Sequence, residues 1–156
     1  MQIRRAEEKD IEKLIVLLQE VLEIHAALRP DIFISGTTKY TAEELQQMIL
    51  DDEKPIYVAA DDEDAVVGYA FCQIKEFHNN NMHSFKMLYI DDLCVDQNAR
   101  GQHVGATLFE YVKSEAKRLN CREVVLNVWE GNENAKHFYE KVGMKVRSMQ
   151  MEYLLD

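Results

Sequence analysis

The sequence predicts a single α/β domain in which helices cover the faces of a mixed β-sheet. Its 156 residues are 47% hydrophobic and 29% charged, which suits one globular domain with its own core. The hydrophobic pattern changes between strand-like runs and helical stripes in the order β-α-α-β-β-β-α-β-α-β. No repeat, low-complexity tract or Pro/Gly-rich linker interrupts this order, so we expect residues 1–156 to form one domain.

The N-terminal part of the chain predicts one strand followed by two helices. Residues 3–6 are short enough for a first strand, and Asp10 is placed to cap the next helix, which stops near Pro30. Thr41 and Glu44 have the spacing of a capping box at the start of a second helix. The apolar residues that recur with the helical period are Ile11, Leu14, Ile15, Leu18, Val21 and Leu22, and then Leu45, Met48 and Ile49.

The middle of the chain predicts a hairpin and a longer strand. Residues 56–60 and 65–75 have the apolar character of strands, and the acidic run 61–64 between them is typical of a turn. We therefore expect these two strands to pair with each other. The polar loop 78–81 then leads to a strand at roughly 85–95.

The C-terminal part of the chain predicts two more helices and two more strands. We expect a helix at about 103–119 and a buried, β-branched strand at 124–128. A short helix over 132–141 ends with Gly143 as its C′ residue. Residues 144–154 are then expected to form the final strand of the sheet.

Charge and cysteine content narrow the classes of function. The net charge of −10 argues against a nucleic-acid ligand and is compatible with a cationic acceptor, although solubility alone also accounts for it. Cys72, Cys94 and Cys121 have no paired spacing and are interpreted as reduced thiols. With no run of about 18 apolar residues and no secretory signal, we expect a cytoplasmic protein without a membrane partner.

One turn has the features of an anion-binding site. Between the strand at 85–95 and the helix at 103–119, a short polar connection carries Arg100 and Gly101. A helix that begins there leaves backbone N–H groups unpaired at the positive end of its dipole, which favours phosphate. Gly101 and Gly105 let the backbone approach an anion, and Arg100 adds a charged donor. A plain strand-loop-helix connection fits the same residues, and the absence of GxGxxG and Walker sequences argues against NAD and ATP.

The same turn resembles the signature of the GNAT superfamily of N-acetyltransferases, which runs Arg/Gln-x-x-Gly-x-Gly/Ala. Arg100, Gly105 and Ala106 match it, and Gly101 is also common in the family. His103 stands where the first motif glycine is usual, and a positive φ costs a histidine more than a glycine. The backbone angle at His103 is therefore left open: the histidine takes the strained positive φ, or it takes ordinary helical angles and offers its N–H, with the imidazole beside the phosphates. In either case we expect the site to survive the change and only its affinity to suffer.

A second segment resembles the family's Asn-x-x-Ala-x-x-Phe-Tyr-x-x-x-Gly-Phe helix, with Met144 in place of the last aromatic residue. The resemblance implies a GNAT-like fold with a central, twisted, mostly antiparallel sheet of six to seven strands and about four helices. It also implies an acetyl-CoA-dependent N-acetyltransferase that acts on a primary amine by direct attack in a ternary complex. The matching residues are Asn132, Ala135, Phe138, Tyr139 and Gly143.

The resemblance also implies the coenzyme contacts. In this family the strand before the turn splays from its neighbour, and a backbone N–H near Cys94 polarises the thioester carbonyl. Asn132 is implied as a hydrogen-bond partner of the coenzyme, although a helix-capping role fits as well. No metal-ligand spacing links the histidines, so we expect acetyl-CoA as co-substrate and no metal. The implied coenzyme-binding residues are Leu93, Cys94, Val95, Arg100, Gly101, Gln102, His103, Val104, Gly105, Ala106, Asn132, Ala135 and Phe138.

Three residues are candidates for the proton transfers. Tyr139 matches the tyrosine that protonates the leaving sulfur, although a packing role beside Phe138 also fits. Residues 89–95 resemble the corresponding strand of spermidine/spermine N-acetyltransferases, which implies Asp91 as the base, acting directly or through water, with Asp92 near the amine. Strand alternation points these two aspartates to opposite faces unless a bulge intervenes. One solvated and one structural acid is therefore an equal alternative.

The acceptor is left open by the sequence. In such folds the segments 23–40 and 78–84 select it, and Phe33, Tyr40 and Trp129 line an acceptor wall or belong to the core or a dimer contact. We expect a small or polyamine-like amine. The alternatives are a peptide or protein N-acetyltransferase, a non-catalytic acetyl-CoA sensor or a nucleotide-binding protein, and the candidate acid favours catalysis. A homodimer through the terminal strands is compatible with this fold.

Overall fold

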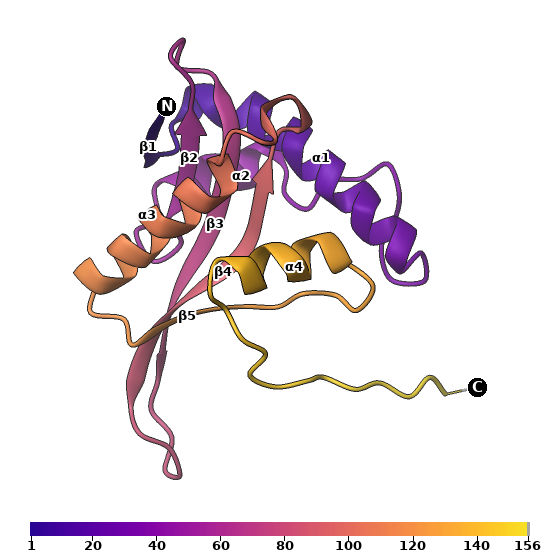
Figure 1. Ribbon diagram of the computed structural model, residues 1–156, viewed down its shortest axis with the longest axis vertical. Coiled ribbons are helices and arrows are strands. Elements are labelled where there is room, and N and C mark those ends of the chain that lie inside the picture. The colour runs from indigo at the N-terminus through magenta and orange to yellow at the C-terminus, as the bar shows by residue number, and fades with distance from the viewer. Residues whose placement is uncertain (156) are drawn as a thin grey trace.

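The computed structural model describes residues 1–155, and its elements follow one another largely as the sequence predicts (Figure 1). The strands are β1 (Gln2–Arg5), β2 (Ile56–Ala60), β3 (Val66–Phe77), β4 (Phe85–Val95) and β5 (Glu123–Leu126). The α-helices are α1 (Ile11–Leu28), α2 (Ala42–Ile49), α3 (Val104–Arg118) and α4 (Glu133–Lys141), and short 3-10 turns occupy Glu8–Asp10 and Gln97–Ala99. Within the described residues, no helix combines the length and apolar character that crossing a membrane requires.

The sheet is mixed and places its strands in chain order, β1-β2-β3-β4-β5. Neighbouring strands are antiparallel from β1 to β4, whereas β5 runs parallel to β4. The helices α1 and α2 cover one face and α3 covers the other (Figure 1). The mixed sheet flanked by helices is therefore confirmed, but within residues 1–155 it has five strands, not six to seven.

Alternation along β3 explains how one sheet supports two layers of helices. Tyr69 and Phe71 belong to the core cluster that contains Leu14 of α1 and Leu45 of α2. Ala70, which lies between them in sequence, belongs to the second cluster, beneath α3. The centre of the sheet is therefore packed on both sides, and the adjacent end of β4 is held between two core layers.

The helix ends test the capping predictions. Thr41 Oγ1 accepts from the Glu44 N–H at 3.2 Å and the Glu44 carboxylate accepts from the Thr41 N–H at 3.1 Å, which confirms the capping box of α2. Gly143 has a φ of +102°, as expected for the residue that ends α4. Asp10 stands at the N-cap of α1 as predicted, but its carboxylate makes no cap hydrogen bond to that helix. It accepts instead from the Glu7 N–H at 2.8 Å, which closes a capping box on the preceding 3-10 turn, and from the guanidinium of Arg4.

The C-terminal part differs most from the sequence prediction. Residues 144–154 form no strand, and no backbone hydrogen bond joins residues 145–155 to the rest of the described chain. The strand predicted at 124–128 is present as β5, Glu123–Leu126, but the prediction that it is buried is wrong, since all four of its residues are only half-buried. The physical reason is that β5 has β4 on one edge and no strand on the other within the described residues.

Candidate active site

The chain leaves β4 through a turn that Asp96 holds in place. Its carboxylate accepts from the Asn98 N–H at 2.9 Å and forms an ion pair with Lys13 of α1. The contact with Lys13, followed by the Asn98 N–H, lowers the pKa of Asp96 below the usual aspartate value. Neither sequence motif includes Asp96, although an aspartate between a strand and a helical turn is a typical capping signal.

The turn presents a row of free backbone donors at the start of α3. Among the described residues, no protein group accepts a hydrogen bond from the N–H groups of residues 101–106. The N–H of Thr107 is the first that does bond, to the carbonyl of His103 at 3.0 Å. Since the free donors lie at the positive end of the helix dipole, the turn has the electrostatic character of a phosphate site.

His103 takes the left-handed backbone conformation, with φ 60° and ψ 22°. Of the two conformations that the sequence left open, ordinary helical angles are therefore excluded. The His103 carbonyl accepts from both the N–H and the hydroxyl of Thr107, at 3.0 and 2.7 Å, and this pair of bonds fixes the first turn of α3. The turn keeps a backbone that glycine adopts without strain, and the histidine adopts it at a cost of roughly 1–2 kcal/mol.

Gly105 connects the two sequence motifs. A Cβ atom at this position would lie 3.1 Å from the Phe138 ring of α4 and 3.5 Å from Val95. Phe138 therefore fills the space beside Gly105, which the sequence prediction had assigned to an anion. Gly101 is the open position, since its φ is +83° and no described atom lies within 4 Å of a Cβ there. Packing of Phe138 on α3 brings the next residue, Tyr139, toward the end of β4.

Asn132 fixes the start of α4. Its side-chain oxygen accepts from the N–H of Ala135 at 3.3 Å, which confirms the capping role. This cap orients the helix that carries Phe138 and Tyr139. The contact of Asn132 with the coenzyme stays a prediction.

The strands β4 and β5 separate before the turn. Their parallel pairing runs from Met87 opposite Glu123 to Ile90 opposite Leu126 and stops there. No strand within the described chain pairs with the β5-facing edge of residues 91–95. This free edge agrees with the splayed strand that the family resemblance implies.

Strand alternation shows which backbone groups line the free edge. The Asp96 N–H donates to the carbonyl of Val67 in β3 at 2.8 Å, and alternate residues of an antiparallel strand direct their groups to the same side. Cys94 therefore directs its N–H to β3. The donors on the free edge belong to Leu93 and Val95, which flank Cys94 as the resemblance implies.

A β-bulge decides the direction of the two aspartates in β4. The partner of Phe71 in β3 is Asp92 and the partner of Cys72 is Ile90, so Asp91 is an extra residue without a partner. The bulge removes the alternation that otherwise sends Asp91 and Asp92 to opposite faces. The two carboxylates consequently turn toward the same helical layer.

Tyrosines from that layer hold both carboxylates. Asp91 Oδ2 accepts from the Tyr40 hydroxyl at 2.8 Å and lies 2.9 Å from Lys39 Nζ. Asp92 Oδ2 accepts from the Tyr69 hydroxyl at 2.7 Å. Both tyrosines pack in the core cluster of α1 and α2, so the acids are fixed from the inside of the protein.

Asp92 and Tyr139 have shifted protonation equilibria. Burial raises the pKa of Asp92 to about 6, although the Tyr69 hydrogen bond and the charge of Lys39 oppose the shift. Burial also raises the pKa of Tyr139, and the nearby Asp92 and Cys94 add to this effect. At neutral pH Asp92 is thus largely ionised and able to accept a proton, while Tyr139 retains its own.

Cys94 is unsuited to act as a nucleophile. Its side chain is buried, and burial, followed by the charge of Asp92, raises the pKa of its thiol to about 12. Because the thiolate is the reactive form, a thiol that stays protonated disfavours a covalent acetyl-cysteine route. Direct transfer between donor and acceptor is the chemistry that this geometry favours.

The sequence profile of the Acetyltransferase (GNAT) family matches residues 18–144, a span that includes both motifs and the whole of β4. The chain belongs to this acetyltransferase family. It is an acetyl-CoA-dependent N-acetyltransferase, and hence an acyltransferase. The free donors of the turn agree with the anionic coenzyme that the family uses.

Individual relatives of this GNAT acetyltransferase act on different amines. The peptidyl-lysine N-acetyltransferase YjaB of Salmonella typhimurium is 30% identical over 144 residues, which cover 92% of this chain and 83% of that protein. A mutant of the BH1408 protein from Bacillus halodurans has a crystal structure with a TM-score of 0.94 and 30% identity, covering 99% of both chains. Glucosamine-6-phosphate N-acetyltransferase from Arabidopsis thaliana has a TM-score of 0.70 and 25% identity, covering 99% of this chain and 98% of that one. These relatives give no support to the spermidine/spermine branch.

The acetyltransferase has an aromatic cluster at the end of α1. Phe33 and Trp129 meet edge to face with ring centroids 5.4 Å apart, and His25 lies 5.2 Å from Phe33. The guanidinium carbon of Arg29 lies 5.8 Å from the centroid of Trp129. Two of the three predicted wall residues are therefore in contact, whereas Tyr40 packs against the core of the α1 and α2 layer.

The hairpin loop 78–84 lies at the far end of β4 from the turn (Figure 1). Asp91 follows Phe85 by six residues in the strand, a distance of roughly 20 Å at about 3.3 Å per residue. Within one copy, a small amine bound at Asp91 would therefore lie out of reach of this loop, and its selection of the acceptor stays a prediction.

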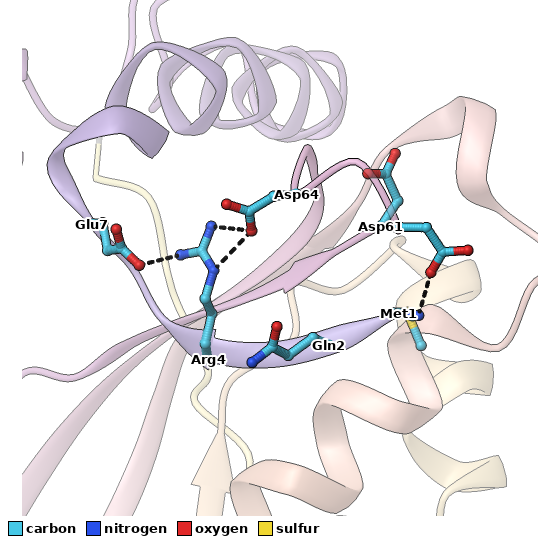
Figure 2. A pocket seen from close by; sticks show the side chains of 7 residues that line it. Met1, Gln2, Arg4, Glu7, Asp61 and Asp64 are labelled. Atoms are coloured by element: carbon cyan, nitrogen blue, oxygen red, sulfur yellow. Dashed lines mark hydrogen bonds and ion pairs between the residues drawn. The ribbon is translucent and has the colours of Figure 1, made fainter.

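A surface hollow lies beside the amino terminus, lined by β1 and the β2–β3 turn (Figure 2). There Arg4 lies between Glu7 and Asp64, with nitrogen–oxygen distances of 3.6 and 3.0 Å, and also bonds to Asp10 at 2.8 Å. The arginine at the centre of this hollow is already paired with three carboxylates, and these ion pairs connect β1 to the β2–β3 turn. The hollow is therefore assigned no part in the chemistry at β4.

Proposed function

We propose that this enzyme transfers the acetyl group of acetyl-CoA to a primary alkyl amine, with Asp92 as base and Tyr139 as acid. The observation that supports this most strongly is that Asp92, on the strand whose edge β5 leaves free, lies near enough to Tyr139 for its charge to help raise the pKa of the tyrosine hydroxyl. Burial raises the pKa values of both groups. Asp91 is not chosen as the base, because its Oδ2 already accepts from the Tyr40 hydroxyl and is paired with Lys39. Its role in the proposal is to add negative charge beside the ammonium.

The turn and the free edge fit the coenzyme. The free N–H groups of residues 101–106 would hold its pyrophosphate, and Arg100 would add a charged donor. Leu93 and Val95 would hold the pantetheine arm through the backbone groups of the free edge. Acetyl-CoA supplies the thioester that serves as acetyl donor.

The proton transfers follow from the two shifted groups. Asp92 would take a proton from the ammonium, directly or through a water molecule, and so produce the neutral amine that attacks the carbonyl carbon. The N–H groups of Leu93 and Val95 would stabilise the charge that develops on the carbonyl oxygen. Attack of the nitrogen on the carbonyl carbon would form the carbon–nitrogen bond, and Tyr139 would donate its proton to the sulfur as the carbon–sulfur bond breaks. The second proton, which the attacking nitrogen loses on becoming an amide, would return to the Tyr139 phenolate.

The acceptor in this proposal is a small amine. The net charge of −10 attracts polycations, and Phe33 and Trp129 offer aromatic faces to an ammonium group. A lysine side chain of a peptide is the second candidate, because the relative that is 30% identical is a peptidyl-lysine N-acetyltransferase. Both acceptors present the same alkyl ammonium to Asp92, so the proton transfers are common to them.

A competition between acceptors tests this assignment. The purified protein is given acetyl-CoA with spermidine, a diamine or a lysine-containing peptide with a blocked amino terminus, and CoA release is followed. We expect the small amines to give the larger kcat/KM. Turnover of the peptide alone would reassign the acceptor to a lysine side chain, and no release with any amine would contradict catalysis.

The role of Tyr139 is tested by Tyr139→Phe, which removes only the hydroxyl. We expect kcat to fall by roughly 10²-fold, as is typical when a general acid is removed, while the affinity for acetyl-CoA stays unchanged. Tyr111→Phe is the matched control, because Tyr111 lies on α3 and packs on Tyr57, away from β4 residues 91–95. A kcat equal to that of the control would remove Tyr139 from the acid role.

A further inference from the structure

The loop between α1 and α2, residues 29–41, places a lysine ammonium at a carboxylate that the proposed acceptor would meet. Lys39 Nζ lies 2.9 Å from Asp91 Oδ2, which also accepts from the Tyr40 hydroxyl at 2.8 Å. In the proposed function, Asp91 adds negative charge beside the ammonium of the acceptor. Lys39 carries the same alkyl ammonium group, so the chain holds one of its own amines where a substrate amine is expected.

The ammonium of Lys39 also lies near the proposed base. The β-bulge turns Asp91 and Asp92 toward the layer of α1 and α2, and the loop that carries Lys39 joins these two helices. The positive charge of Lys39 opposes the burial that raises the pKa of Asp92. One chain therefore holds an amine close to the carboxylate that would take its proton.

Contacts on both sides of Lys39 hold the loop in place. Before it, the Glu23 carboxylate of α1 accepts from the Ser35 hydroxyl and from the Gly36 N–H, each at 2.6 Å. After it, the Tyr40 ring packs against the core cluster of α1 and α2. The side chain of Lys39 itself stays 44% exposed. A group on a short flexible tether has an effective concentration on the order of millimolar, so this amine needs no binding step of its own.

The lysine stem is long enough to bring the amine from Asp91 to the thioester. In the proposed function the thioester carbonyl lies at the N–H groups of Leu93 and Val95. Leu93 follows Asp91 by two residues, roughly 7 Å along the strand at about 3.3 Å per residue. The four-carbon stem of a lysine is flexible, so rotation about its side-chain bonds moves the ammonium over this distance while the backbone stays in place.

We propose that the enzyme transfers an acetyl group from acetyl-CoA to Nζ of its own Lys39, within one chain. The inference rests on the proposed function, because it uses the same base and the same acid. Asp92 takes one proton from the Lys39 ammonium, and the neutral Nζ attacks the carbonyl carbon to form the carbon–nitrogen bond. The carbon–sulfur bond breaks, and Tyr139 donates its proton to the sulfur. The nitrogen returns its second proton to the Tyr139 phenolate, so the products are acetylated Lys39, CoA and a proton on Asp92.

Lys113 gives a matched comparison for the uncatalysed reaction of acetyl-CoA with surface lysines. Its Nζ pairs with Glu110 at 2.6 Å, and its side chain is 39% exposed, close to the value for Lys39. It lies on α3, which covers the opposite face of the sheet from α1 and α2. Exposure and pairing with a carboxylate are therefore alike for the two lysines, whereas the nearness of Asp92 differs.

Peptide mass spectrometry of the full chain, incubated with acetyl-CoA and no added amine, tests the proposal. We expect Lys39 to be acetylated at least roughly 10²-fold faster than Lys113, as is typical of the contribution of a positioned base. In Asp92→Asn we expect the rate at Lys39 to fall to that at Lys113. Circular dichroism shows whether the variant keeps the fold.

Two lysine variants locate the modified amine. Lys39→Arg keeps a cation opposite Asp91 but removes the acceptor amine, so we expect its intact mass to stay unchanged while the native protein gains one acetyl group. Lys113→Arg is the matched control and is expected to gain the acetyl group as the native protein does. Transfer within one chain also predicts that, at saturating acetyl-CoA, the fraction acetylated after a given time is the same at every protein concentration.

The possible outcomes separate this inference from the proposed function. Equal rates at Lys39 and Lys113, an unchanged rate in Asp92→Asn, or a rate that rises with protein concentration would each overturn self-acetylation within one chain. Turnover of a free amine while Lys39 stays unmodified would overturn the inference and leave the proposed function intact. Acetylation of Lys39 that depends on Asp92, without turnover of any free amine, would support the inference and remove the small acceptor from the proposed function. If neither Lys39 nor a free amine is acetylated, both fail.

Discussion

At Asp92, burial opposes ionisation while the Tyr69 hydroxyl favours it, and the balance sets the pKa at about 6. A carboxyl with a raised pKa binds its proton more tightly in the folded protein than in the unfolded chain. The free energy of unfolding therefore falls as the pH rises from about 4 to about 6, and the loss persists at neutral pH. A group that destabilises the fold at neutral pH and lies at a strand bulge is a natural place for a functional base.

Asp92→Asn keeps the shape of the side chain and removes its charge. The shift from 3.8 to about 6 corresponds to about 3 kcal/mol, so we expect the variant to gain up to that amount at pH 7 and little at pH 4. Urea unfolding at the two pH values measures the difference. Asp91→Asn is the control and is expected to lose stability, because it weakens contacts with Lys39 and Tyr40. An Asp92→Asn variant no more stable than native at pH 7 would contradict the raised pKa.

Because His103 has a left-handed backbone conformation, replacement by glycine is expected to stabilise the protein at this position and to destabilise it at a helical histidine. His103→Gly relieves roughly 1–2 kcal/mol of strain and costs roughly 0.5–1 kcal/mol in unfolded-state entropy, so we expect a net gain of up to roughly 1.5 kcal/mol. His137 lies on the exposed side of α4, and His137→Gly is expected to destabilise. Thermal unfolding of both variants measures the effect, and a loss of stability in His103→Gly would contradict the account of the turn.

At the scale of elements, β4 combines three features that the site requires: the bulge at Asp91, the free edge and the exit into the turn. The sequence places this strand correctly at 85–95 because local features, an apolar run and the glycines after it, define its ends. The bulge and the free edge depend on register with β3 and β5, which no local pattern records. Asp96 is missed for a related reason, since its ion pair is with Lys13, more than eighty residues earlier.

Asp96 links β4 to α1, and its loss is expected to loosen the turn. We expect Asp96→Asn to lower the free energy of unfolding at pH 7 by about 1.5–3 kcal/mol, as for other hydrogen bonds to charged groups. The pKa of Asp96 is lowered, so its contribution is complete above the unfolded aspartate value near 3.9 and is lost as the pH falls through the folded value. Urea unfolding at a series of pH values should therefore show that the free energies of unfolding of the variant and the native protein converge as the pH falls.

Asp62→Asn is the control for Asp96→Asn, because Asp62 is 98% exposed and contacts only the amino-terminal nitrogen of Met1 among the described residues. We expect this change to leave stability at pH 7 within about 0.5 kcal/mol of native. If the two variants behaved alike, Asp96 would not be the residue that holds the turn. Weaker acetyl-CoA binding by Asp96→Asn alone would connect the same ion pair to the coenzyme site.

At the scale of the whole molecule, the order of elements and the two motifs were predictable because each depends on neighbouring residues in the sequence. The hairpin of β2 and β3, the helix α3 and the cap at Asn132 are examples. The final strand predicted at 144–154 is absent, because whether a segment pairs as a strand depends on a partner far away in the sequence, which no local pattern records. The same limit applies to the acceptor, since Phe33 and Trp129 meet only in the folded chain.

The pH dependence of kcat/KM for acetyl transfer tests the central claim, that Asp92 is the base of this enzyme. We expect kcat/KM of the native protein to rise with pH through an ionisation near 6, as Asp92 loses its proton. In Asp92→Asn we expect that rise to be absent and the rate at pH 7 to fall by at least roughly 10²-fold. A native profile without this ionisation, or an Asp92→Asn profile that retains it, would contradict the claim.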